Sequence, residues 1–180
     1  MKKIAFLLLS AVVFQSSFAQ KVVNVGGAPM YPSKNIIENA VNSKDHTTLV
    51  AAVKAAGLVN TLEGAGPFTV FAPTNEAFGK LPKGTVETLL KPENKALLVK
   101  ILTYHVVPGK LDAKALAKMI KDGNGTAMLK TVAGGTLQLS MEGKKIILTD
   151  EKGGKATVTI PNVYQSNGVI HVIDSVVQPS

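Results

Sequence analysis

Hydrophobic residues recur at helical spacing through the first half of the chain. Over residues 47–56 one helical face is apolar, and Gly57 follows it as a stop signal. The apolar residues of that face are Leu49, Val50, Val53 and Ala56. The same spacing predicts further short helices over residues 36–41, 58–62, 85–90, 92–102 and 113–122.

Side chains that can cap a helix precede several of these segments. Ser33 or Asn35 can cap the first helix, and Asp45 or Thr47 the second. Asp112 can cap the last one. In the segment that starts at Pro92, the expected buried stripe consists of Leu97, Leu98, Ile101 and Leu102.

From Thr126 onward the period changes to alternation of apolar and polar residues, which is typical of half-buried strands. Alternating runs cover residues 136–141 and 155–160, and glycine-containing turns separate the runs at spacings that suit an antiparallel meander. Residues 169–173 are apolar at nearly every position, so we expect a central strand buried on both faces. Helices followed by strands indicate an α+β fold.

Residues 66–78 form the expected centre of the fold. Three of the six phenylalanines lie here, at Phe68, Phe71 and Phe78, and the chain has no tryptophan. The pattern predicts a strand over residues 68–72 that ends at Pro73, because proline cannot donate a ladder hydrogen bond. A short helix should follow, capped by Thr74 or Asn75.

The N-terminal residues have the pattern of an export signal. Lys2 and Lys3 precede an apolar run, and Ser17 and Ala19 supply the small residues that a signal peptidase needs. We therefore interpret residues 1–19 as a signal peptide, and the run is too short for a membrane-spanning helix. Residues 20–32 are expected to form an extended linker, with a strap over the domain as the alternative. Residues 33–179 form the domain.

Composition narrows the possible functions. The chain has no cysteine, which excludes disulfides and a lipid-modified cysteine. The formal net charge is +8, and it falls to +6 when the two lysines of the signal peptide are removed. All 20 basic residues are lysines, whereas bidentate recognition of phosphate or guanine uses arginine. The lysines are also scattered along the sequence, with no run longer than two. We therefore expect no nucleic-acid binding. The basic surface favours anionic polysaccharide, phospholipid head groups or an acidic cell envelope, with plain solubility as the alternative.

Ser166, His171 and Asp174 contain the residue types of a catalytic triad. A triad is defined by geometry, and no Gly-x-Ser-x-Gly pattern is present. On a strand over residues 169–173, His171 shares a face with Val169 and Ile173, which predicts a core histidine bonded to a nearby acceptor. His46 has no further metal ligands near it in the sequence, so it is interpreted as a solvated or capping residue. No enzyme activity, cofactor or metal site is expected.

Tyr104 and His105 are the remaining candidates for function. Adjacent residues of a strand face opposite ways, so one of the two should be buried and the other nearer the surface. The flanking Val106 and Val107 favour a core position, in which His105 would bond a backbone or carboxylate group and fix a junction of helix and strand.

Three segments together resemble the fasciclin (FAS1) domain family: residues 68–78, residues 102–109 and residues 167–174. They occur in the family's order and span about its usual domain length. The resemblance implies a wedge or sandwich of antiparallel strands with helices packed around it. It also implies structural signature residues, which are Phe68, Thr69, Val70, Phe71, Ala72, Pro73, Thr74, Asn75, Phe78, Asn167, Gly168, His171 and Asp174.

In animal members, the segment that Tyr104, His105, Val106 and Val107 resemble contacts integrins, which makes these four residues the candidate binding site. The function implied is that of an exported, non-enzymatic interaction module in adhesion or in cell-surface or matrix association. A secreted small-molecule or lipid-binding protein is the alternative. The expected partners are a surface or matrix protein or an anionic polysaccharide, with self-association also possible, in the periplasm or outside the cell.

Overall fold

The computed structural model describes residues 21–180, and the expected signal peptide lies outside them. The described chain begins with a hairpin of β1 (Val23–Val25) and β2 (Ala28–Met30), which pair antiparallel. Val25 and Met30 are buried in the core. The expected linker over residues 20–32 is therefore wrong for residues 23–30, because alternate residues of both short strands point into the domain.

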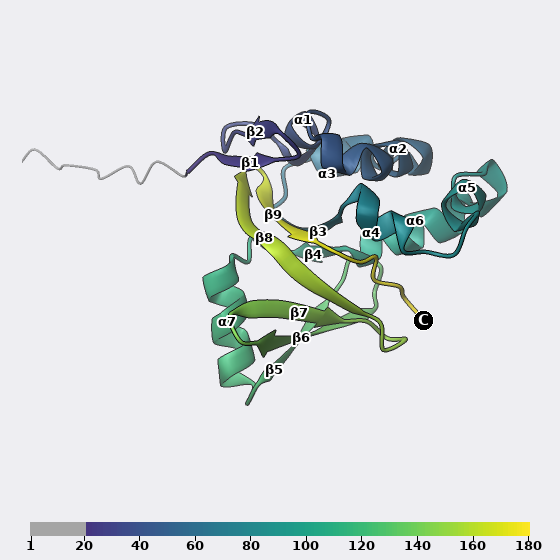
Figure 1. The fold of residues 1–180 in the computed structure, drawn as a ribbon. Helices are drawn as coiled ribbons and strands as arrows, with labels where there is room; N and C mark the ends of the chain where they lie inside the picture. Colours follow the sequence, from purple (N-terminus) through teal and green to yellow (C-terminus); the bar gives the residue numbers. More distant parts are fainter. Residues whose placement is uncertain (1–20) are drawn as a thin grey trace, which may run out of the picture.

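Three short helices follow and form one layer of the molecule together with the hairpin (Figure 1). They are α1 (Ile36–Ala40), α2 (Thr47–Ala56) and α3 (Val59–Glu63), and a 3₁₀ turn at Lys44–His46 precedes α2. Asn35 caps α1 in a reciprocal capping box with Glu38. Neither Asp45 nor Thr47 caps α2 with its side chain.

The predicted strand and helix of the central stretch are both present, as β3 (Phe68–Pro73) and α4 (Asn75–Gly79). Thr74 caps α4, since its hydroxyl accepts from the backbone N–H of Ala77. Next come α5 (Thr85–Leu89), the 3₁₀ turn Pro92–Asn94 and α6 (Lys95–Tyr104). Of the stripe expected on α6, Leu98 and Leu102 are buried, whereas Leu97 is exposed.

From Val106 onward the chain is rich in strands, and Asp112 caps α7 (Ala113–Asp122), as predicted. The elements are β4 (Val106–Pro108), α7, β5 (Thr126–Lys130), β6 (Thr136–Glu142), β7 (Lys145–Thr149), β8 (Lys155–Gln165) and β9 (Gly168–Ile173). The α+β class is confirmed.

Seven strands form one mixed sheet in the order β4-β3-β9-β8-β7-β6-β5. The pairs are antiparallel except for β3 and β9, which run parallel. The expectation of antiparallel strands throughout is thus wrong for this pair, since residues 74–167 form the long crossover connection that parallel neighbours require. The long strand β8 pairs with β7 at its start and with β9 afterwards, and two register shifts mark its bend.

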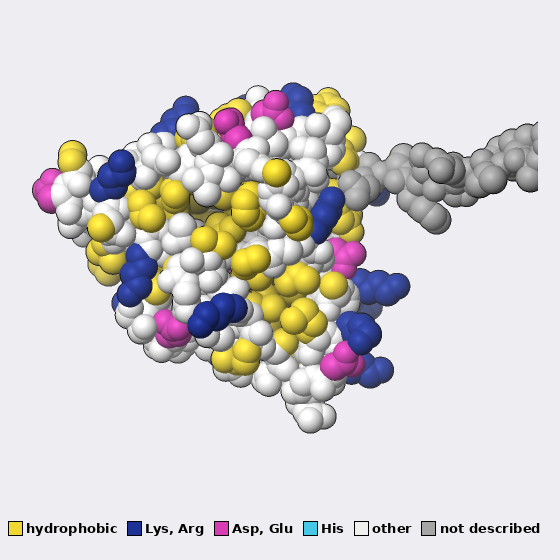
Figure 2. Space-filling view, turned by 180° about the vertical axis from the view of Figure 1, so that it is seen from behind, with side chains coloured by type: hydrophobic (Ala, Val, Ile, Leu, Met, Phe, Trp, Pro, Cys, Tyr) yellow, Lys and Arg dark blue, Asp and Glu magenta, His cyan; other side chains and the backbone are white. Residues whose placement is uncertain are grey.

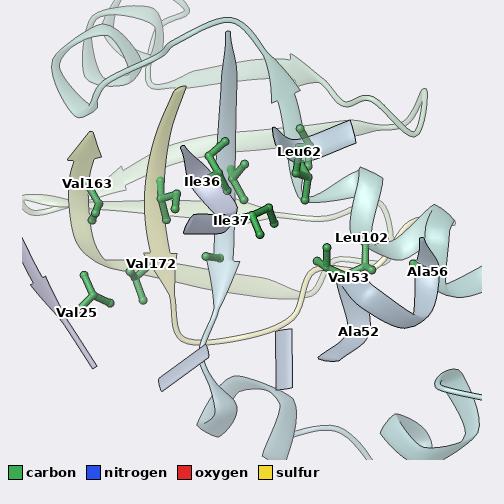
Figure 3. Close-up of a cluster of buried hydrophobic side chains, with 14 of the residues drawn as sticks. Val25, Ile36, Ile37, Ala52, Val53, Ala56, Leu62, Leu102, Val163 and Val172 are labelled. Atoms are coloured by element: carbon green, nitrogen blue, oxygen red, sulfur yellow. The ribbon is translucent and has the colours of Figure 1, made fainter. Parts of the chain in front are cut away.

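The central strands β3 and β9 separate two hydrophobic cores. Val70 and Val172 belong to the first core, which Figure 3 shows in close-up, while Phe71 and Ile173 belong to the second core, on which α7 packs. All six residues of β9 are buried, which confirms the predicted central strand. Within residues 21–180, no helix has the length and apolarity needed to cross a membrane.

Candidate functional site

The segment of Tyr104, His105, Val106 and Val107 lies inside the domain. Tyr104 is the last residue of α6, and His105 follows it as the helix cap rather than as a strand residue. All four side chains are buried, with exposed fractions of 0%, 3%, 5% and 3%. The expectation that one of the first two lies nearer the surface is wrong, because a helix end, unlike a strand, can turn both side chains inward.

The Tyr104 hydroxyl connects α6 to the strand-rich half. It donates to the carbonyl of Thr136 at 2.7 Å and accepts from the backbone N–H of Glu151 at 3.3 Å. Burial raises the pKa of Tyr104 to about 12, so the hydroxyl keeps its proton and its donor role at physiological pH. The buried ring and the two hydrogen bonds of its hydroxyl therefore hold the end of α6 against the strand-rich half.

His105 bonds two backbone groups at the junction of helix and strand. Its Nε2 accepts from the N–H of Val177 at 3.3 Å, so the ring proton is on Nδ1, which donates to the Ile101 carbonyl at 2.8 Å. Burial lowers the pKa of His105 to about 4, with smaller opposing effects from the Ile101 carbonyl and Asp150. These contacts confirm the interpretation of His105 as a junction residue.

The first signature stretch, residues 68–78, joins several elements through side chains. The Phe71 ring stacks on the His171 ring, with centroids 5.7 Å apart. The Thr69 hydroxyl donates to the Gly109 carbonyl and accepts from the N–H of Leu111. These contacts hold the loop after β4 against β3.

Asn75 has a role that sequence reasoning missed. Its Oδ1 accepts from the N–H of Thr48 at 3.0 Å, and its Nδ2 donates to the Lys44 carbonyl at 2.8 Å. Although Asn75 begins α4, it therefore caps α2. No local sequence signal predicts this contact, because 27 residues separate Asn75 from Thr48.

The second signature stretch, residues 167–174, joins the strands to the helical layer. Asn167 accepts from the N–H of Ile36 and donates to the carbonyls of Leu62 and Gly64, so it bonds both α1 and α3. Gly168 runs so close to Phe68 that a Cβ on it would overlap the Phe68 carbonyl.

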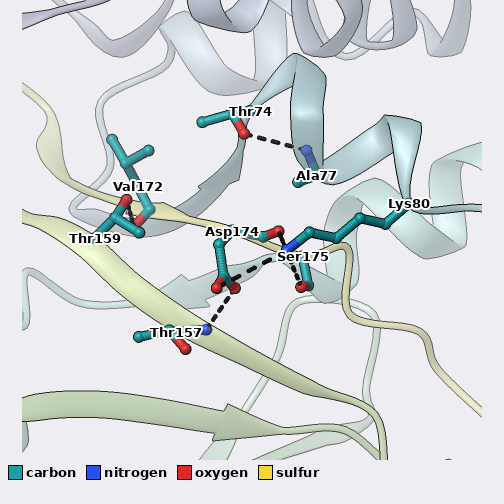
Figure 4. A network of polar contacts seen from close by, with 8 residues as sticks. All are labelled: Thr74, Ala77, Lys80, Thr157, Thr159, Val172, Asp174 and Ser175. Atoms are coloured by element: carbon teal, nitrogen blue, oxygen red, sulfur yellow. Dashed lines mark hydrogen bonds and ion pairs between the residues drawn. The ribbon is translucent and has the colours of Figure 1, made fainter.

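Asp174 completes this stretch at the end of β9 (Figure 4). Its Oδ1 accepts from the N–H of Thr157 at 2.8 Å. Lys80 lies 3.9 Å from its carboxylate and donates to its backbone carbonyl at 2.6 Å. Asp174 therefore holds β8 and the segment after α4 together.

The residues of the possible triad do not form one. The Nε2 of His171 donates to the Leu111 carbonyl at 2.8 Å, and its Nδ1 accepts from the N–H of Asn162. Both ring nitrogens are thus engaged with backbone, while Ser166 is exposed and Asp174 bonds Thr157. His171 is a core histidine with a nearby acceptor, as predicted.

His46 is buried, with 4% of its surface exposed, so the expected solvated position is wrong. It occupies the N-cap position of α2, which was the other expectation, but its side chain makes no capping hydrogen bond. Its Nδ1 lies 2.9 Å from the Ser43 hydroxyl, and its Nε2 has no hydrogen-bond partner among residues 21–180. Over the same residues, no group of three or more histidine, cysteine, aspartate or glutamate side chains is placed to hold a metal ion.

Lysines cover the surface of the domain. All 18 lysines of residues 21–180 are exposed, and Figure 2 shows charged side chains spread around the apolar areas of one face. Three ion pairs occur within the described part: Lys80–Asp174, Lys118–Asp122 and Lys155–Glu142. Most lysines therefore have no acidic partner.

One helix arranges its lysines in a line. Lys114, Lys118 and Lys121 of α7 are spaced at i, i+4 and i+7, which places them on one face, while Leu116 and Ile120 are buried on the other. Among the described residues, Lys114 and Lys121 have no acidic partner within ion-pair distance. The spacing is visible in the sequence, but sequence reasoning treated the lysines as scattered.

Comparisons with known proteins agree with this architecture. The sequence pattern described as the fasciclin domain matches residues 44–179. Protein sll1483 of Synechocystis sp. is 49% identical over 160 residues, covering 89% of this chain and 82% of its own length. Immunogenic protein MPB70 of Mycobacterium bovis is 36% identical over 145 residues, covering 78% of this chain and 66% of its own.

Among solved structures, a FAS1 domain pair from the insect cell adhesion molecule Fasciclin I superposes with a TM-score of 0.71. The similarity covers 79% of this chain and 50% of the insect chain at 19% sequence identity, so it shows the fold alone.

Proposed function

The chain belongs to the fasciclin domain family, and from that premise we propose that it is an exported, non-enzymatic module that associates with the cell surface or extracellular matrix. The insect protein that shares the fold is named a cell adhesion molecule, which supports the adhesion class. The residues before the domain support export, since they have the pattern of a signal peptide. The observation that carries the proposal is the exposed positive charge, which belongs entirely to lysines.

The proposed partner is an anionic polysaccharide or an acidic surface or matrix protein. Residues 21–180 contain 18 lysines and 12 acidic residues, a formal net charge of +6. Lysine acts as a hydrated point charge, so such a surface binds through several weak contacts that salt screens.

The lysine line of α7 is the proposed centre of this surface. Its buried face anchors α7 on the second core through Leu116 and Ile120, so the helix presents its lysines on a fixed backbone. By contrast, Tyr104 and its neighbours are buried and face no partner without local unfolding. The proposed interaction surface is therefore α7 and not residues 104–107.

The test measures the affinity for alginate, a polyanionic polysaccharide, by calorimetry at low salt. The variant Lys114→Gln/Lys121→Gln removes two charges from the line. The matched control Lys83→Gln/Lys91→Gln removes two exposed lysines beside α5. At about 1 kcal/mol per lysine near an anionic surface, the α7 variant should bind roughly tenfold or more weakly, and the control should change much less.

An equal loss of affinity in both variants would mean that lysines contribute to binding wherever they lie on the surface, and that α7 is not the binding site. No binding by the wild type to alginate or to acidic matrix protein, at any salt concentration, would count against the interaction class itself.

A further inference from the structure

A cavity of about 390 Å³ lies between α4, α5, α6 and the C-terminal segment, residues 176–180. In Figure 1 this segment, the yellow end of the chain, lies below α5 and α6. Pockets that hold small molecules measure about 300–1,000 Å³, so this cavity has room for a small ligand. Its apolar wall includes Phe78, Leu81, Leu89, Leu97, Ile101 and Val176.

The cavity has a buried floor and an exposed rim. Leu98 and Leu102 of α6 line it and are buried. Leu97 and Lys152 also line it, but both are exposed, so they lie on the side that opens to solvent. A ligand can therefore bury one end among apolar side chains while its other end stays at the rim.

The charge on the wall is positive. Six polar residues complete the lining: Thr85, Lys100, His105, Lys152, Gln178 and Ser180. None of these six has an acidic side chain. His105 is neutral at physiological pH, because burial lowers its pKa to about 4. Lys100 donates to the backbone oxygen of Ser180 at 2.7 Å. Lys152 forms no ion pair within residues 21–180, so its ammonium is the one left for a ligand.

Two acidic residues, Asp150 and Glu151, precede Lys152 in the chain, but neither lines the cavity. Asp150 accepts hydrogen bonds from three backbone N–H groups. Glu151 accepts from two. Backbone groups therefore hold both carboxylates outside the wall of the cavity, and the rim favours an anionic ligand.

We propose that this cavity binds a fatty acid of medium chain length, whose chain fills the apolar part and whose carboxylate lies at the rim beside the Nζ of Lys152. A single chain suits the volume, which is near the lower end of the range for ligand pockets. The apolar stem of Lys152 can line the cavity while its ammonium stays in water with the carboxylate. This inference is independent of the proposed adhesion function, since no residue of α7 lines the cavity.

The test measures binding of decanoate by NMR of the methyl groups of Leu89, Ile101 and Val176, below the concentration at which decanoate forms micelles. These signals should shift in a saturable way, while the methyl signals of Val53 in the first core should not respond. Octanoate, whose chain is shorter by two CH₂ groups, should bind roughly tenfold more weakly. Decyltrimethylammonium, which has a chain of the same length and a cationic head, should bind more weakly than decanoate.

The variant Lys152→Gln removes the charge at the rim. It should bind decanoate roughly two- to fivefold more weakly, and it should bind decanol, which has no charge, as well as the wild type does. The matched control Lys144→Gln removes an exposed lysine that does not line the cavity, and it should leave decanoate binding unchanged. Leu97→Glu places a carboxylate on the exposed rim, so it should weaken binding of decanoate more than binding of decanol.

Absence of saturable methyl shifts with decanoate would overturn the proposal. So would equal losses of decanoate affinity in Lys152→Gln and Lys144→Gln, because the head group would then respond only to the net charge of the protein. Tighter binding of decyltrimethylammonium than of decanoate would contradict the assigned head group. Alginate plays no part in this test, so a negative result leaves the adhesion proposal standing, and loss of alginate binding leaves this one standing.

Discussion

At the scale of residues, polar signature side chains bond the backbone of elements distant in sequence. Thr69 bonds the loop before α7, Asn75 bonds the start of α2, and Asn167 bonds α1 and α3. Each satisfies backbone groups that lack partners within their own helix or strand. The signature is therefore a set of contacts that hold the layers together.

Phe71 is the apolar counterpart of these contacts. Its ring is fully buried and stacks on the ring of His171. Phe71→Ala should lower the free energy of unfolding by roughly 3–5 kcal/mol, because it leaves a cavity beside a buried histidine. Urea unfolding followed by circular dichroism measures the change. A loss below about 1 kcal/mol would contradict the packing described here.

The buried histidines predict a dependence of stability on pH. Burial lowers the pKa of His105 to about 4, and it also lowers the pKa values of His46 and His171. In the unfolded chain a histidine pKa is about 6.5, so the unfolded state binds more protons between these values. Stability should therefore fall as the pH drops from 6.5 towards 4.

For His105 alone, the expected loss at pH 4.5 relative to pH 7 is roughly 2–3 kcal/mol, measured by urea unfolding. The variant His105→Asn keeps an amide that can donate to the Ile101 carbonyl but cannot titrate, so its loss over this range should be smaller. Backbone hydrogen bonds lower the pKa of Glu151 to about 2. Its stabilising effect is therefore lost mainly below pH 4.5, outside the range compared here. A wild-type stability that is constant from pH 7 to 4.5 would contradict the account.

At the scale of elements, α2 depends on a cap that comes from another helix. Asn75→Ala removes the acceptor of the Thr48 N–H and the donor to the Lys44 carbonyl. Loss of a helix cap costs about 1 kcal/mol. Hydrogen exchange should accelerate in the first turn of α2, with Asn60→Ala, an exposed residue of α3, as the control. Unchanged exchange in that turn would show that the cap is unimportant.

The sequence predicts most elements but not their long-range contacts. Apolar periodicity and local caps correctly indicate α7 and its cap Asp112, and the apolar run of residues 169–173 correctly indicates a central strand. Local patterns fail at the β1–β2 hairpin, where three-residue strands are too short to show alternation. They also fail at Tyr104, because valines after it suggest a strand that in fact begins two residues later.

Prediction of the candidate sites from the sequence has the same limit. The burial of His46 and its unpaired Nε2 depend on helices and strands that meet only in the fold, so no spacing in the sequence predicts them. The lysine line of α7 is different, because helical spacing alone reveals it. Sequence therefore predicts features within one element, and contacts between elements need the structure.

At the scale of the whole molecule, the central strands separate two hydrophobic cores. The first core contains an apolar cavity and His46, and the second core supports α7 and its lysines. Substitutions in the first core that leave the protein folded should therefore leave binding through the lysines of α7 nearly unchanged, since distant sites without shared partners act additively.

The central claim is that the exported domain is held at an anionic surface by its lysines. Its most direct test is fractionation of bacterial cells that produce the full chain, washed at low salt and then at 1 M salt. The account predicts that the mature protein, beginning at Gln20, remains with the envelope at low salt. High salt, which shortens the screening length to about 3 Å, should release it, and Lys114→Gln/Lys121→Gln should already be released at low salt. Retention that neither salt nor this variant reduces, or an intact chain that stays in the cytoplasm, would contradict it.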